Sequence, residues 1–149
     1  MLAWDRKRHQ NGLMIQNGFG IFHKNFQLVR ASPSSGFIHI WRQDSSPYTW
    51  YKGQTVVRRK DGAIVPNQWV IGQPLIISSS FNRDFEVIYL ANNNVLRHWY
   101  YSHTAGKWFD VETIGSFIGG YPGYAQTDDS SFALAVRRTD GTLVEVSPV

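Results

Sequence analysis

An internal repeat is the feature that most constrains how this chain can fold. Three segments share one plan, in which a short apolar stretch is followed by a polar turn and an alternating strand; they cover residues 13–31, 75–91 and 124–138. The alternating strands are centred on Phe26, Phe85 and Phe132. Self-similarity at this spacing is typical of proteins built by stacking one supersecondary unit.

Each repeat continues through a second turn into a second strand. The turns read SPSSG (32–36), NNN (92–94) and TDG (139–141). Gly and Asn tolerate positive φ, so these compositions predict hairpin turns. The strands that follow, FIHIWRQD, VLRHWYYS and TLVEVSPV, place Trp41, Trp99 and Val146 at corresponding positions.

The first two repeats carry a further Trp nine residues later, as Trp41 with Trp50 and Trp99 with Trp108. The segment after each later Trp supplies a fourth strand. In the strand from Phe85 to Leu90 both alternating sets are largely apolar, which suits a strand covered on both faces, as in stacked sheets. Short strands at regular spacing describe a sandwich, a barrel or a propeller, and repetition of a four-strand unit favours the propeller.

The sequence therefore predicts a single all-β domain over residues 1–149, made of about three four-stranded β-propeller blades. The approximate repeats are 12–56, 72–115 and 119–149, with residues 1–8 completing the last, because Trp4 falls near the position of the Trp that the third repeat lacks. An insertion between Trp50 and Trp69 contains a DG turn and predicts an added hairpin or loop.

Three blades are too few to close a propeller, which typically has four to eight. We therefore expect two copies to associate head to tail as a homodimer that forms a six-bladed ring. Two alternatives stay open at this point: the chain is part of a longer propeller, or its three units form a small barrel.

Composition excludes several kinds of stabilisation and targeting. The chain has no Cys, so neither disulfides nor thiolate zinc sites are available. The basic start of the sequence is not followed by an apolar stretch of signal-peptide length, and no window approaches the length of a membrane span. We expect no membrane insertion, and the sequence leaves the cellular location open.

Charge and motif content also argue against several functions. The net charge is +4, and six of the fifteen basic residues lie in two short runs, Arg6–Arg8 and Arg58–Lys60. These runs are not interleaved with the repeated aromatic residues, so nucleic-acid binding is not expected. The five His residues lack metal-ligand spacing, and no nucleotide-binding fingerprint is present. A catalytic carboxylate at Glu86 would have no counterpart in the other repeats, where Gln27 and Ala133 take its place. We therefore expect no enzyme, and we also expect no cofactor.

Residues 81–108, and more loosely residues 24–50, resemble the repeat of PLL-type propeller lectins, in which a strand like NFEVV is followed by a turn, an L-x-H-x-W strand and a later Trp. The resemblance implies a β-propeller lectin that binds fucose-like or O-methylated sugars in shallow pockets between neighbouring blades. The His-x-Trp pattern is kept at His39-Ile40-Trp41, but it reads Arg97-His98-Trp99 in the second repeat and Val144-Glu145-Val146 in the third.

Sugar binding suits aromatic rings, on which the apolar face of a pyranose stacks while a few polar groups fix its hydroxyls. The candidate ligand-binding residues are Trp50, Trp108, Trp41, Trp99, His39, Arg97 and Tyr100. The competing interpretation is that the repeated Trp residues pack between blades and that Arg97, like Arg42, lies in solvent. The alternative function is a non-catalytic structural or protein-interaction propeller that binds no sugar.

Overall fold

The computed structural model describes residues 12–16, 26–32, 36–42, 47–60, 63–65, 69–78, 85–126 and 132–146. Over these residues the protein is all-β, as predicted, and contains no helix. The described part also holds no helix that could cross a membrane. The predicted closing segment 1–8, with Trp4, lies outside the described residues.

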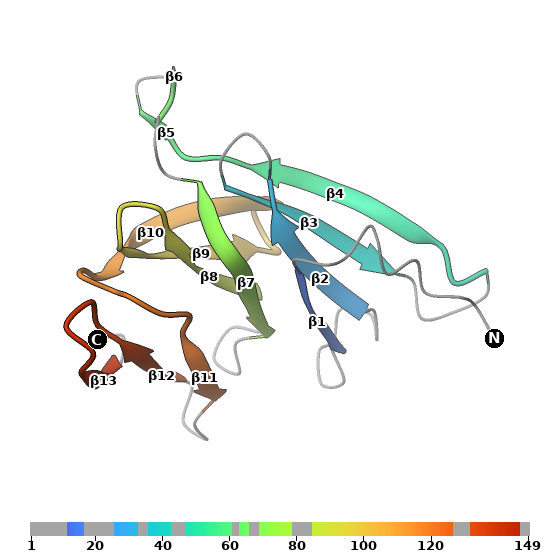
Figure 1. The fold of residues 1–149 in the computed structure, drawn as a ribbon. Helices are drawn as coiled ribbons and strands as arrows, with labels where there is room; N and C mark the ends of the chain where they lie inside the picture. Colours follow the sequence, from blue (N-terminus) through green and yellow to red (C-terminus); the bar gives the residue numbers. More distant parts are fainter. Residues whose placement is uncertain are drawn as a thin grey trace.

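Within the described residues, thirteen strands form three larger antiparallel sheets and one small hairpin (Figure 1). Sheet I consists of β1 (Gly12–Gln16), β2 (Phe26–Ala31), β3 (Phe37–Arg42) and β4 (Trp50–Val56). Sheet II consists of β7 (Val70–Ser78), β8 (Phe85–Ala91), β9 (Leu96–Ser102) and β10 (Lys107–Gly115). Sheet III consists of β11 (Gly123–Gln126), β12 (Phe132–Arg137) and β13 (Leu143–Val146). In each sheet the strands pair in sequence order, so every connection joins neighbouring strands.

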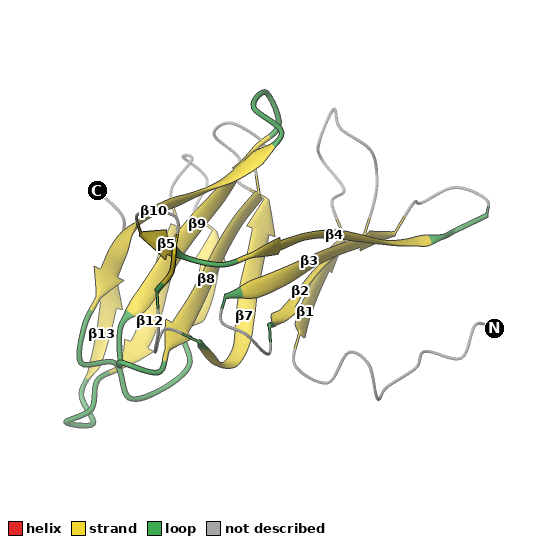
Figure 2. Ribbon diagram, turned by 90° about the horizontal axis from the view of Figure 1, so that it is seen from above, coloured by secondary structure: helices red, strands yellow, loops and turns green. Residues whose placement is uncertain are grey.

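Sheet II lies between the other two sheets, which pack on its opposite faces (Figure 2). The alternation along β8 explains this position, because successive side chains of a strand point to opposite faces. Val87 and Tyr89 join the core shared with Phe37 of sheet I, whereas Ile88 and Leu90 join the core shared with Leu134 of sheet III. The prediction of a strand covered on both faces is confirmed.

The predicted hairpin turns are also confirmed. Each turn contains a residue with positive φ. The residue is Gly36 (79°) between β2 and β3, Asn94 (60°) between β8 and β9, and Gly141 (90°) between β12 and β13. At Gly36 no other residue fits, because a Cβ atom there would lie 1.9 Å from the carbonyl oxygen of Val56.

The insertion after sheet I forms the predicted hairpin, in which β5 (Arg59–Lys60) pairs with β6 (Ala63–Ile64). The described sheets remain separate and open, and none closes into a barrel, so the small-barrel alternative is wrong.

One predicted correspondence within the repeat is also wrong. Gln27 pairs with Trp41, and at the matching step of sheet II Glu86 pairs with Tyr100. Tyr100, not Trp99, is therefore the counterpart of Trp41, while Trp99 points to the opposite face and enters the core with sheet I. Matching the repeats by their Trp residues caused this error. The face that each side chain occupies is set by the strand register, which follows the backbone pairing.

Candidate functional site

The register of β2 and β3 brings a histidine, an amide and two aromatic rings together on one face of sheet I. His39 Nε2 lies 2.7 Å from Gln27 Oε1, and both side chains are buried. Trp41, two residues further along β3, stacks on Tyr51 of β4 with ring centroids 4.3 Å apart. Trp41 is half-buried and Tyr51 is exposed. We call Gln27, His39, Trp41 and Tyr51 the first histidine site.

Sheet II carries the same arrangement. His98 Nε2 lies 2.8 Å from Glu86 Oε2, and the two side chains are 10% and 13% exposed. Tyr100 stacks on Phe109 of β10 with a centroid distance of 5.0 Å, and the Lys107 ammonium lies 4.8 Å from the Phe109 ring centroid. We call Glu86, His98, Tyr100 and Phe109 the second histidine site.

The two sites are equivalent by position as well as by composition. In both, twelve residues separate the hydrogen-bonded pair, and the aromatic residue stands two positions after the His. The first site is on the face of sheet I that packs on sheet II, and the second is on the face of sheet II that packs on sheet III. The His-x-aromatic pattern is thus kept in sheet II as His98-Trp99-Tyr100.

His39 is held in its neutral form. Its ring lies 5.5 Å from that of Trp108 and 6.0 Å from that of Phe85, centroid to centroid. Burial is the main cause that lowers the pKa of His39 to about 4, and the neighbouring His103 lowers it further. Because the Gln27 carbonyl oxygen can only accept, the neutral ring donates its Nε2 proton to Gln27.

A glycine makes room for this ring. Gly53 on β4 lies beside the bulge in the β3–β4 pairing between Ile38 and Ile40. A Cβ atom at Gly53 would come within 2.9 Å of His39 Nδ1. The first histidine site therefore depends on the absence of a side chain on the neighbouring strand.

The other candidates from the sequence lie elsewhere. Trp99 and Trp108 are 5% and 9% exposed and pack edge-on against Phe37 in the core between sheets I and II. Trp50 is half-buried at the start of β4, with the Arg42 guanidinium 5.8 Å from its ring centroid.

Arg97 faces the same core and is 4% exposed. Its guanidinium binds both carboxylate oxygens of Asp110, at 3.0 and 2.8 Å, and the Thr113 hydroxyl. Arg58, just after β4, also binds Asp110, at 3.0 Å. Asp110 thus joins the two sheets, and Arg97 is a partner in an ion-pair network.

Sequence reasoning missed Gln27, Glu86, His98, Tyr51 and Phe109 as members of a site. The constant twelve-residue spacing between a Gln or Glu and a His was the available signal, but the matched Trp residues concealed it. In the part of the chain that the structure describes, no three His, Asp or Glu residues gather as metal ligands would.

No protein-family model and no curated protein sequence matches the chain. The similarity to propeller lectins therefore depends on the short motifs of residues 81–108 and 24–50 alone.

Proposed function

We propose that this protein is a non-enzymatic β-propeller lectin whose histidine sites bind sugars. The observation that carries the proposal is the recurrence, at the same strand positions of two sheets, of a hydrogen-bonded His beside a stacked aromatic pair. The rings beside these pairs are partly exposed, which packing in a core does not require.

The composition of each site matches the surface of a pyranose. Stacked rings offer an apolar face to the C–H groups of a sugar, as Trp41 with Tyr51 and Tyr100 with Phe109 would. Glu86, whose side chain is 13% exposed, carries carboxylate oxygens that accept hydrogen bonds from hydroxyls, whereas Gln27 is buried and positions the His39 ring. Fucose-like or O-methylated sugars, which combine an apolar face with few hydroxyls, are the ligands that the resemblance suggests.

The arrangement of the sheets supports the propeller. Sheets I and II have four sequential antiparallel strands each, sheet III has three in the described residues, and successive sheets pack face to face as propeller blades do. The face of sheet III that turns away from sheet II includes Leu143, which is 79% exposed, and the exposed Ala135. We propose that sheet I of a second copy covers this face, in a head-to-tail dimer of six blades.

A glycan array tests the sugar-binding proposal. We expect the purified protein to bind fucosylated or O-methylated glycans, and Trp41→Ala and Tyr100→Ala each to reduce that binding about tenfold or more by removing a stacking face. Trp69→Ala is the matched control, because Trp69 is 47% exposed and belongs to neither histidine site. A folded protein that binds no glycan would instead support the alternative, a protein-interaction propeller.

A further inference from the structure

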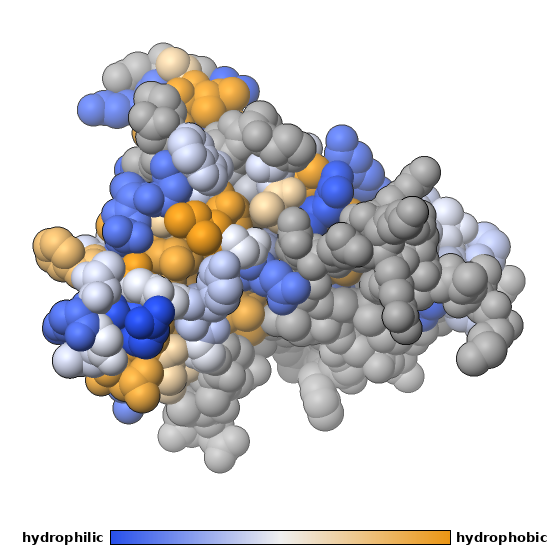
Figure 3. Space-filling view, viewed as in Figure 1, coloured by the Kyte–Doolittle hydropathy of each residue, from blue (hydrophilic) through white to orange (hydrophobic). Residues whose placement is uncertain are grey.

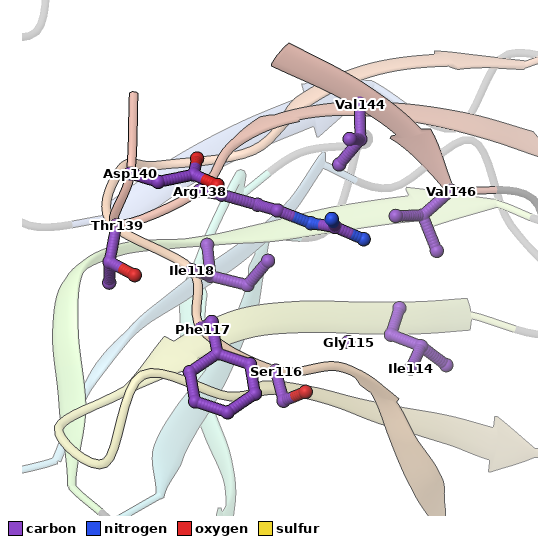
Figure 4. A pocket seen from close by; sticks show the side chains of 10 residues that line it. All are labelled: Ile114, Gly115, Ser116, Phe117, Ile118, Arg138, Thr139, Asp140, Val144 and Val146. Carbon is purple, nitrogen blue, oxygen red and sulfur yellow. The ribbon is translucent and has the colours of Figure 1, made fainter. Parts of the chain in front are cut away.

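A cavity of about 610 Å³ lies between sheets II and III and is lined by residues other than those of the two histidine sites (Figure 4). Ile114 at the end of β10 and Ile118 in the following loop form one wall, and Val144 and Val146 of β13 form the other. All four side chains belong to the core between sheets II and III or pack against it. The cavity therefore offers a ligand an apolar surface that is continuous with this core.

The turn between β12 and β13 brings two opposite charges to this cavity. Figure 4 shows Arg138 extending between the two walls from the turn that also carries Asp140. Among the described residues the Arg138 guanidinium has neither a hydrogen-bond nor an ion-pair partner. Thr142 donates its backbone amide and its hydroxyl to Asp140 Oδ1, which leaves Oδ2 open. These hydrogen bonds are the main cause that lowers the pKa of Asp140, so its carboxylate is charged at neutral pH.

The backbone that carries both charges is fixed. Arg138 bridges to Ile118, and its amide donates to the Thr142 carbonyl at 2.8 Å. The Thr139 amide donates to the Phe117 carbonyl at 2.7 Å. A site whose backbone is already ordered loses less conformational entropy when a ligand binds.

Phe117 adds an aromatic ring to the rim of the cavity. It is 73% exposed and has a φ of 58°, a conformation that bulky side chains rarely adopt. Two backbone hydrogen bonds hold it there, from the Thr139 amide to Phe117 and from the Ile118 amide to Asn94. The ring belongs to neither core of the described residues, and backbone strain of this kind is concentrated at ligand sites. Figure 3 shows apolar surface beside strongly hydrophilic surface on the flank that carries sheet III.

We infer that this cavity binds an α-amino acid with a large apolar side chain, such as leucine. Arg138 binds the carboxylate of the ligand, Asp140 binds its ammonium group, and the apolar walls and Phe117 contact its side chain. A simple anion would be repelled by Asp140 and a simple cation by Arg138, whereas a ligand with both charges suits both residues. This site is separate from the sugar sites of the proposed function and does not depend on them.

Calorimetric titration with blocked ligands tests each charge separately. The protein is titrated with L-leucine, with N-acetyl-L-leucine, which has no ammonium group, and with L-leucinamide, which has no carboxylate. We expect leucine to bind and each blocked ligand to bind about tenfold more weakly or worse. Glycine, which has both charges but no apolar side chain, should lose at least as much. No binding of leucine at about 10 mM, or a blocked ligand that binds as well as leucine, would overturn the inference.

Two variants assign the charges to their residues. Asp140→Asn should weaken the binding of leucine about tenfold without weakening that of N-acetyl-leucine, and Arg138→Gln should do the same for leucine and leucinamide. Arg59→Gln is the matched control, because it removes an exposed positive charge from the β5–β6 hairpin and should leave leucine binding unchanged. A variant that weakens both of its ligands equally would contradict the contact assigned to that residue. The titrations contain no glycan, so their outcome is independent of the proposed lectin activity.

Discussion

At the scale of single residues, the first histidine site depends on space beside His39. Gly53→Ala would place a Cβ atom 2.9 Å from His39 Nδ1 and force the ring or β4 to move. We expect a loss of about 1–3 kcal/mol in the free energy of unfolding, as for overpacked cores, measured by urea denaturation. Gly123→Ala is the control, because the nearest atom there is 3.8 Å away. Equal losses in both variants would contradict this account.

The lowered pKa of His39 should also make the stability of the protein depend on pH. Its pKa is lowered from 6.5 to about 4 in the folded protein, so between these values the unfolded chain binds more protons than the folded one. The free energy of unfolding therefore keeps its full value above pH 6.5. It decreases as the pH falls toward 4, by about 3 kcal/mol at most. Denaturation midpoints at pH 7 and pH 5 measure the effect.

The matched variant is His39→Gln, which cannot titrate and should show a flatter dependence over the same pH range. If the wild-type protein and this variant lose stability in parallel, another group is responsible.

At the scale of secondary-structure elements, the network around Asp110 ties β10 of sheet II to the end of sheet I. Asp110→Asn leaves the Arg97 charge buried without its carboxylate, which should cost about 3 kcal/mol. Arg58→Gln removes the more exposed partner, at 34% exposure, and should cost less than about 1 kcal/mol. Chemical denaturation of the two variants gives the comparison, and a larger effect for Arg58→Gln would reverse the assigned roles.

The elements themselves were largely predictable from the sequence. Turn residues that accept positive φ, such as Gly36 and Asn94, mark the hairpins, and alternation along β8 indicates coverage on both faces. The equivalence of strands was not predictable in full. Matching Trp41 to Trp99 shifts the second repeat by one residue, and in a strand a one-residue shift exchanges the two faces.

At the scale of the whole molecule, the proposed ring requires the outer face of sheet III to be an interface. Leu143→Glu should weaken association, because it replaces an apolar side chain of that face, which is 79% exposed, with a charge. Sedimentation equilibrium should give twice the 17.1 kDa chain mass for the wild type and the chain mass for the variant. Thr104→Glu, in an exposed turn, should remain dimeric. A wild-type monomer at micromolar concentration would refute the ring.

The sequence by itself determined the all-β class, the repeated order of strands and the positions of the turns, because these depend on local preferences and on the two-residue period of a strand. Only the tertiary structure decided which side chains meet. It buried Trp99, Trp108 and Arg97 between sheets and joined His39 to Gln27 and His98 to Glu86. The physical reason is that such contacts follow from strand register and from packing between sheets, which link residues far apart in the chain.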